Sequence, residues 1–224
     1  MARTYVIGDI HGCYCSLTKL LQCLSPDPIE DTLVFLGDYV DRGPESAQVL
    51  DLLLELSGRQ RMITLMGNHE QLFLDYLQGG NQEYFLHLGG RETLASYNIT
   101  WPVTREQLGR VPPAHINFLR GLHLYWEDQH AIYVHAGLQP GRHLSQQQVD
   151  WCLWVRDKFI DSPHDFGKPV IFGHTVFTAP LVQANKIGID TGAVYGGSLT
   201  CLVLPEREFI QVPGECRSPY SWNI

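Results

Sequence analysis

The sequence is poor in basic residues and contains no basic cluster. Its 224 residues include 16 Lys and Arg, only four of them Lys, against 24 Asp and Glu, which gives a formal net charge of −8. An acidic surface repels the nucleic-acid backbone, and the basic residues are scattered along the chain, so nucleic-acid binding through a basic patch is excluded. Taken alone, the same charge balance also argues against anionic substrates.

The sequence also lacks a secretory leader, a long apolar run and paired cysteine spacing. The first apolar stretch contains Asp9 and His11 and has no basic leader before it, and no apolar run approaches the length needed to span a bilayer. We therefore expect a cytoplasmic protein without membrane contact. The six cysteines show no C-x-x-C spacing and are expected to be reduced thiols. They are Cys13, Cys15, Cys23, Cys152, Cys201 and Cys216.

The pattern of apolar residues predicts an α/β chain. With 44% hydrophobic residues, a chain of this length can bury one core without disulfides, so we expect a single domain over residues 1–224. Strands are predicted at 5–7, 33–36 and 62–66, with helices near 17–24, 47–56 and from residue 70. Glycine and proline pairs break the pattern at about 79–120, which predicts a mostly helical insert.

After residue 121 the sequence is typical of strands. They are expected at 122–127, 131–135, 169–172, 181–183, 186–190, 199–204 and 209–212, and we interpret them as a second, largely antiparallel sheet. The stretch 137–167 is expected to form a loop with a short helix. The predicted fold is α/β (α+β), with two stacked mixed β-sheets forming a sandwich flanked by helices.

Polar side chains of metal-ligand type follow five predicted strands. The segments are YVIGDIHG, LVFLGDYVDRG, ITLMGNHE, AIYVHAG and VIFGHT, and a sixth strand ends similarly at Asp190 in IGIDTGAV. Ligands of α/β sheets bind beyond the carboxyl ends of strands, so we expect these side chains to converge on one crevice. The convergent set is Asp9, His11, Asp38, Asn68, His135 and His174.

Oxygen and nitrogen donors without a thiolate suit Mn, Fe or Zn in a catalytic rather than a structural site. Six protein ligands are too many for one catalytic ion, whereas two ions that share a carboxylate would use them all. Such pairs hydrolyse phosphate esters. An isolated histidine is more often a core or surface residue, and six others lack the strand-end context. These are His87, His115, His123, His130, His143 and His164.

Three segments, GDIHG, GDYVDRG and GNHE, resemble the signature motifs of the phosphoprotein phosphatase family of calcineurin-like metallophosphoesterases. The later segments HAG, GHT and DTGAV resemble the remaining family motifs, and length and spacing are similar to bacterial and phage members. The resemblance covers residues 8 to about 204. It implies the calcineurin-like fold and two divalent metal ions, with Mn favoured and Fe or Zn as alternatives.

The resemblance also implies a role for each residue. Asp9, His11 and Asp38 would hold the first ion, and Asp38, Asn68, His135 and His174 the second, with Asp38 as the bridge. His69 would be the general acid that protonates the leaving group, and Asp41, expected one helical turn after Asp38, would orient it and raise its pKa. Arg42 and Arg156 would bind the phosphoryl oxygens, together with Asn68.

The function implied is a protein phosphatase that hydrolyses phosphoserine and phosphothreonine monoesters, with phosphotyrosine as a further candidate. A hydroxide bridging the two ions would attack directly. We expect none of the cysteines to supply an alternative nucleophile. Two alternatives stay open. The first is a symmetric dinucleoside tetraphosphatase: the GGSLTCL stretch occurs in similar form in that enzyme, although the Asp41-Arg42 pair favours the phosphatase. The second is a binding module that has lost catalysis. Two divalent ions would also make the pocket positive, which removes the objection to anionic substrates.

Overall fold

Neighbouring residues of each central strand face two different apolar layers. In β1 (Thr4–Ile7), Val6 packs between the two sheets, whereas Tyr5 and Ile7 contact the outer helices. In β5 (Ile132–Val134), Tyr133 faces the inner layer and its neighbours face another outer cluster. Because both faces of each sheet are covered, these strands are continuous apolar runs rather than alternating ones. The structure, a computed structural model, describes residues 2–215.

The first sheet contains both ends of the described chain. Its strand order is β10-β9-β1-β2-β3. β1, β2 and β3 are parallel to one another, and β9 pairs antiparallel with both β1 and β10. The four further strands are β2 (Thr32–Phe35), β3 (Met62–Thr64), β9 (Ser198–Leu204) and β10 (Glu208–Pro213).

The second sheet is mixed. Its order is β4-β5-β6-β8-β7, with β5, β6 and β8 parallel and the two edge strands antiparallel. The other members are β4 (Tyr125–Glu127), β6 (Val170–Phe172), β7 (Leu181–Val182) and β8 (Lys186–Gly188). The expectation that all later strands form a largely antiparallel second sheet is wrong. β9 and β10 return to the first sheet because β9 pairs with β1.

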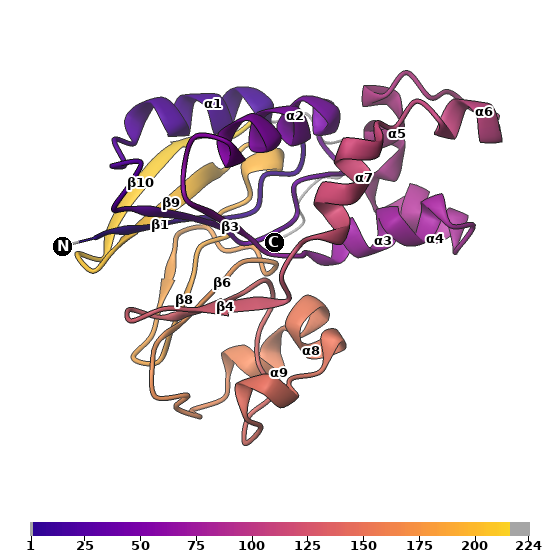
Figure 1. The fold of residues 1–224 in the computed structure, drawn as a ribbon. Helices are drawn as coiled ribbons and strands as arrows, with labels where there is room; N and C mark the ends of the chain where they lie inside the picture. The colour runs from indigo at the N-terminus through magenta and orange to yellow at the C-terminus, as the bar shows by residue number, and fades with distance from the viewer. Residues whose placement is uncertain (1, 216–224) are drawn as a thin grey trace.

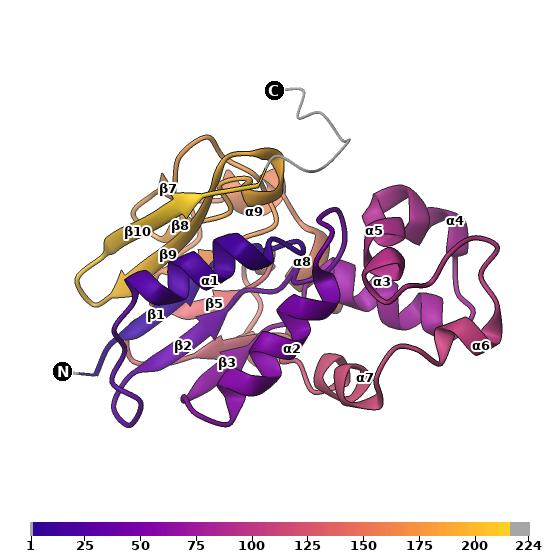
Figure 2. The same cartoon turned by 90° about the horizontal axis from the view of Figure 1, so that it is seen from above.

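Helices cover the outer face of each sheet (Figures 1 and 2). The first sheet is covered by α1 (Tyr14–Cys23) and α2 (Ser46–Ser57). Beside the second sheet lie α8 (Val149–Trp154) and α9 (Asp157–Ile160), after the short η2 (Leu144–Gln146). The stack of two mixed sheets with outer helices is the predicted fold class.

A group of helices lies at one end of the sandwich, set apart from the sheets in Figure 2. It begins with α3 (Asn68–Leu77) and continues through the segment predicted as helical. There the elements are α4 (Gln82–Phe85), the π-helical turn η1 (Leu86–Gly90), α5 (Arg91–Ser96), α6 (Arg105–Leu108) and α7 (Pro113–Arg120).

No helix within residues 2–215 is long and apolar enough to cross a membrane. Cys15, Cys23, Cys152 and Cys201 form no disulfide, and Cys216 lies outside the described residues.

Candidate metal centre

The predicted ligands follow the carboxyl ends of strands from both sheets, in loops except for Asn68, which begins α3. β1, β2 and β3 of the first sheet lead to Asp9, His11, Asp38 and Asn68, and β5 and β6 of the second sheet lead to His135 and His174. All six side chains are buried. Three of these residues have a left-handed backbone: His11 (φ 47°), Asp38 (φ 52°) and His174 (φ 62°). This conformation is unfavourable for residues other than glycine and often marks functional sites.

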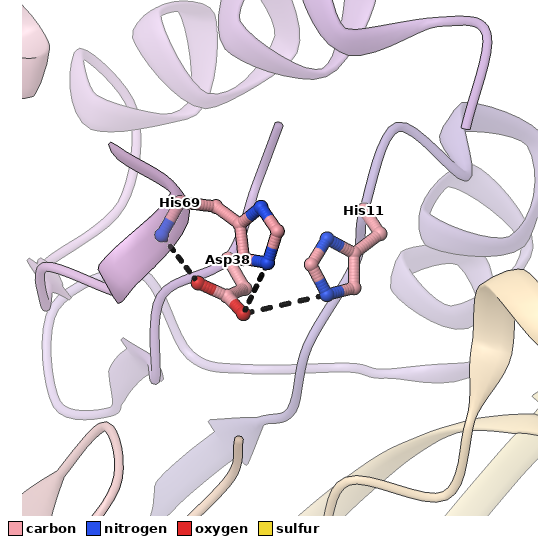
Figure 3. A group of neighbouring side chains, drawn as sticks. All are labelled: His11, Asp38 and His69. Carbon is pink, nitrogen blue, oxygen red and sulfur yellow. Dashed lines mark hydrogen bonds and ion pairs between the residues drawn. The ribbon is translucent and has the colours of Figure 1, made fainter. Parts of the chain in front are cut away.

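Asp38 is at the centre of the group. His11 and His69 face its carboxylate from two sides in Figure 3, with Nε2 atoms 3.3 and 4.0 Å from Oδ2. On the other oxygen, Nε2 of His135 lies 3.4 Å from Oδ1. One carboxylate therefore has imidazoles at both of its oxygens.

Hydrogen bonds on the opposite ring nitrogens fix the tautomers of these histidines. Nδ1 of His11 lies 2.9 Å from the carbonyl oxygen of Val40, and Nδ1 of His135 lies 3.0 Å from that of Leu36. A carbonyl oxygen can only accept, so Nδ1 carries the proton and donates it in both cases. In the neutral imidazole, the lone pair of Nε2 then points toward the acidic Asp38 side chain. This is the arrangement in which histidines bind metals.

Two buried atoms at the centre have no hydrogen-bond partner: Oδ1 of Asp9 and Nε2 of His174. An unsatisfied buried acceptor costs free energy unless a ligand or ion completes it. The backbone N–H of His174 donates to Oδ2 of Asp9 at 3.0 Å, so the two residues are held together. The oxygen and nitrogen donors thus fit divalent cations.

The donor atoms form two groups, each within 4.8 Å: His11, Asp38 and His69, and Asp38, His135 and His174. The second group matches three of the four ligands expected for the second ion. In the first, His69 stands where Asp9 was expected. Asn68 joins the second group through its Oδ1, which lies 3.0 Å from Nε2 of His135.

Burial and charge shift the pKa values at the centre. Burial lowers the pKa of His174 to about 2, and the neighbouring His135 and Arg156 side chains also act to lower it. Burial also raises the pKa of Asp9, as do the negative charges of Asp190 and Asp38. For Asp38, burial would raise the pKa, but the surrounding imidazoles hold it well below its usual value. Cations at this position would favour the ionised form of both carboxylates.

His69 and Asp41 form a buried pair beside Asp38. Nδ1 of His69 lies 2.8 Å from Oδ2 of Asp41, so the expected contact is present. Residues 38 to 41 do not form the expected helical turn. Residues 40–43 form bends, and Asp41 (φ 70°) and Arg42 (φ 69°) have a left-handed backbone. The pKa of His69 also differs from expectation: burial holds it well below its usual value despite the nearby carboxylates.

Arg42 contacts two of the central imidazoles. Its Nη1 lies 2.6 Å from Nε2 of His11, its Nη2 lies 2.9 Å from Nε2 of His69, and its guanidinium lies over the ring of Tyr195 in η3 (Ala193–Tyr195). The guanidinium therefore lies in the centre, beside His11 and His69. A metal bond to His11 would use the same nitrogen lone pair, so Arg42 would have to release it.

Arg156 is exposed and lies at the edge of the centre. It lines a cavity of about 390 Å³ with Trp151, Trp154 and Lys158. The ring of Trp154 packs edge-on against that of His174 at 6.3 Å between centroids. Arg156 is thus near a predicted ligand, but no hydrogen bond ties it to the other predicted site residues.

Two supporting residues were not identified from the sequence. Glu70 is fully buried and accepts four backbone N–H groups around Asp38, at 2.7 to 3.2 Å. Thr93, in α5, donates to Oδ1 of Asp41 at 2.6 Å. Glu70 follows the GNHE histidine, which was a usable signal, whereas nothing near Thr93 singles it out. The metal-type groups found among the described residues contain none of the six set-aside histidines.

Comparison with known proteins is consistent with this centre. The sequence profile of calcineurin-like phosphoesterases matches residues 2–178. The chain is 34% identical to serine/threonine-protein phosphatase 1 of Salmonella typhimurium, over 88% of this chain and 90% of the relative. It is 30% identical to the asymmetrical bis(5'-nucleosyl)-tetraphosphatase PrpE of Anoxybacillus flavithermus, over 93% of each. A crystal structure described as a candidate diadenosine tetraphosphatase superposes with a TM-score of 0.73 at 26% identity, covering 95% of this chain and 93% of that one.

Proposed function

Because the chain belongs to the calcineurin-like phosphoesterase family, whose members use divalent metal ions, we propose that it is a metal-dependent protein phosphatase acting on phosphoserine and phosphothreonine. The observation that carries this proposal is the buried pair of His69 and Asp41 beside Asp38. It provides a proton donor for an alkoxide, which is the poor leaving group of a phosphoserine or phosphothreonine ester.

Two ions would be held by the predicted ligands, with Asp38 between them. Asp9 and His11 would complete the first site, and Asn68, His135 and His174 the second. When bound, the ions would lower the pKa of a water molecule, which supplies the nucleophile, and offset charge on the phosphoryl oxygens. Among these ligand atoms, Oδ1 of Asp9 and Nε2 of His174 are buried without a hydrogen-bond partner and are therefore available to the ions.

In its imidazolium form, and with Nε2 released by Arg42, His69 would give the Nε2 proton to the leaving oxygen. Its Nδ1–H donates to Oδ2 of Asp41, which keeps the ring in one orientation and favours the protonated imidazolium, whereas burial opposes it. Arg42 would move from His11 and His69 to the phosphoryl oxygens, where its planar guanidinium can donate two parallel hydrogen bonds. Arg156, at the rim, would bind the same group from the solvent side.

The test is hydrolysis by the purified protein with Mn²⁺, using a phosphoserine peptide and diadenosine tetraphosphate at matched concentrations. We expect a higher kcat/KM for the peptide. A higher kcat/KM for the dinucleotide would refute the protein phosphatase proposal and support the alternative below.

A second candidate is a dinucleoside tetraphosphatase. The cavity beside His174 has two indole rings, Trp151 and Trp154, together with Arg156 and Lys158. A nucleobase can stack on an indole, and the basic side chains can pair with a phosphate chain. The chain is also 30% identical to relatives named as asymmetrical tetraphosphatases, whereas the sequence alone suggested the symmetric type.

Product analysis separates these two types, because asymmetric cleavage of diadenosine tetraphosphate gives ATP and AMP and symmetric cleavage gives two ADP. If this candidate is correct, Trp154→Leu should raise KM for the dinucleotide more than for a phosphopeptide. Equal changes in both KM values would show that the cavity does not bind the dinucleotide selectively, and it would then no longer support this candidate function.

A further inference from the structure

The helical insert touches the loop of the proposed acid pair at two points. The backbone N–H of Arg42 donates to the carbonyl oxygen of Gly89 in η1 at 3.0 Å. Gly89 has φ of 107°, and a Cβ there would lie 2.6 Å from the Arg42 nitrogen, so only glycine allows this approach. The second contact is made by the hydroxyl of Thr93 in α5, which is fully buried.

The bonds of the Thr93 hydroxyl account for its single proton and its lone pairs. Oγ1 lies 2.6 Å from Oδ1 of Asp41, which accepts the proton. Oγ1 in turn accepts the backbone N–H of Asp41 at 2.8 Å, and the Ser46 hydroxyl lies 3.1 Å away. A carboxylate cannot donate, so the direction of the bond to Asp41 is settled when that group is ionised.

Asp41 is therefore held at both oxygens. Thr93 donates to Oδ1 and the ring of His69 donates to Oδ2 at 2.8 Å, and all three side chains are at most 1% exposed. Without the hydroxyl, Oδ1 would lose its donor in a site that water does not reach, and the carboxylate could rotate about its Cβ–Cγ bond. The plane of Asp41 sets the direction of Nδ1–H and thus of the imidazole.

We propose that Thr93 is a positioning residue for the general acid, acting through Asp41 on His69. This inference rests on the roles proposed above for Asp41 and His69. It gives the helical insert a part in proton transfer, because the insert supplies the hydroxyl that fixes the acid.

The test compares Thr93→Val, which keeps the shape and loses the hydroxyl, with Thr93→Ser, which keeps the hydroxyl. Substrates are an aryl phosphate, whose leaving group needs no acid, and a phosphoserine peptide, whose leaving group does. General acids contribute about 10²- to 10⁴-fold. We expect Thr93→Val to lower kcat on the peptide by at least about tenfold more than on the aryl phosphate, with metal content and KM retained.

Thr93→Ser should restore most of the loss. The matched control is Ser96→Ala, which removes a hydroxyl from the same helix that bonds to the carbonyl of Thr93 and the N–H of Ala47, not to Asp41. The control should show no selective loss on the peptide. Equal losses on both substrates in Thr93→Val, or the same selectivity in Ser96→Ala, would overturn the proposal. If Thr93→Val does not fold, Thr93→Ala carries the same expectation.

A double variant separates positioning from general structure. If Thr93 acts only through His69, adding Thr93→Val to His69→Asn should cause no further loss of kcat on the peptide. Multiplying losses would refute the inference. The single variant His69→Asn tests the proposed function itself: if it shows the selective loss and Thr93→Val does not, only the inference fails. If His69→Asn shows no selective loss, its assignment as the acid fails.

Discussion

Glu70→Gln tests what holds the bridging carboxylate in place. Glu70 begins α3 with Asn68 and His69, and its side chain turns back to the loop of Asp38. Oε2 accepts the N–H groups of Gly67 and Asp38, and Oε1 accepts those of Tyr39 and Val40. Burial and the charge of Asp38 raise the pKa of this carboxyl, but four N–H donors oppose protonation because a proton on either oxygen would face a donor.

The expected cost follows from this count. Glutamine keeps one oxygen and replaces the other with an NH₂ group, so in either orientation two buried N–H groups lose their acceptor and face donors. Each orphaned buried donor costs about 1–3 kcal/mol, which predicts a loss of about 2–6 kcal/mol in the free energy of unfolding. The loop should also hold Asp38 less firmly, lowering metal affinity by about 10- to 100-fold.

Urea unfolding of the metal-free protein measures the first effect, and titration with Mn²⁺ the second. The control is Glu55→Gln, which alters an exposed carboxylate paired with Arg59 and should change stability by less than about 0.5 kcal/mol. A loss in Glu70→Gln no larger than that of the control would refute the assignment of Glu70 as the acceptor that shapes this loop.

Three further predictions concern the centre itself. Asp38→Asn should remove both ions, and full metal occupancy by elemental analysis would contradict its bridging position. Arg42→Lys should keep the metals but lower kcat on the order of 10²-fold, since an ammonium cannot donate in a planar fork; an unchanged kcat would exclude Arg42 from the phosphoryl site. His174 should destabilise the metal-free protein in acid. Its pKa is about 2 in the folded protein, so below about pH 6.5 only the unfolded chain takes up a proton at this residue. The free energy of unfolding therefore falls as the pH falls. From pH 6.5 to 5, wild type should lose about 2 kcal/mol relative to His174→Asn in urea unfolding, and parallel curves would refute this.

The position of the candidate site could be predicted because strand ends carry a strong local signal. Asp9, Asp38, Asn68, His135 and His174 each follow an apolar run, and the carboxyl ends of parallel strands meet at one edge of a sheet. The structure places these side chains together across two sheets. Their individual roles depend on bound ions and remain predictions.

Long-range pairing could not be predicted in the same way. β9 and β10 have the composition of the preceding strands, and composition does not tell which edge a strand joins. Hydrogen bonding to β1, which is almost 200 residues away in the sequence, decides it. Local geometry also misled the interpretation of Asp41, because a spacing of three residues suggests a helical turn, whereas Asp38 and Asp41 themselves have a left-handed backbone and the side chain reaches His69 by a different path.

Thr93 shows a third limit. Its hydroxyl matters only because α5 packs against the loop that contains Asp41, 52 residues earlier. A threonine in a helical segment has no distinguishing pattern, so only the folded structure reveals the contact.

The two metal positions differ in what they connect. The ligands predicted for the first ion, Asp9, His11 and Asp38, all follow strands of the first sheet, whereas His135 and His174 of the second position follow strands of the second sheet. An ion at the second position would bind ligands from both sheets and so connect them. At a free metal concentration of about 100 times its Kd, it would add about 2.7 kcal/mol to the free energy of unfolding. Removing that ion would therefore weaken the contact between the two sheets as well as stop turnover, so metal supply would affect the stability of the folded protein in addition to its rate.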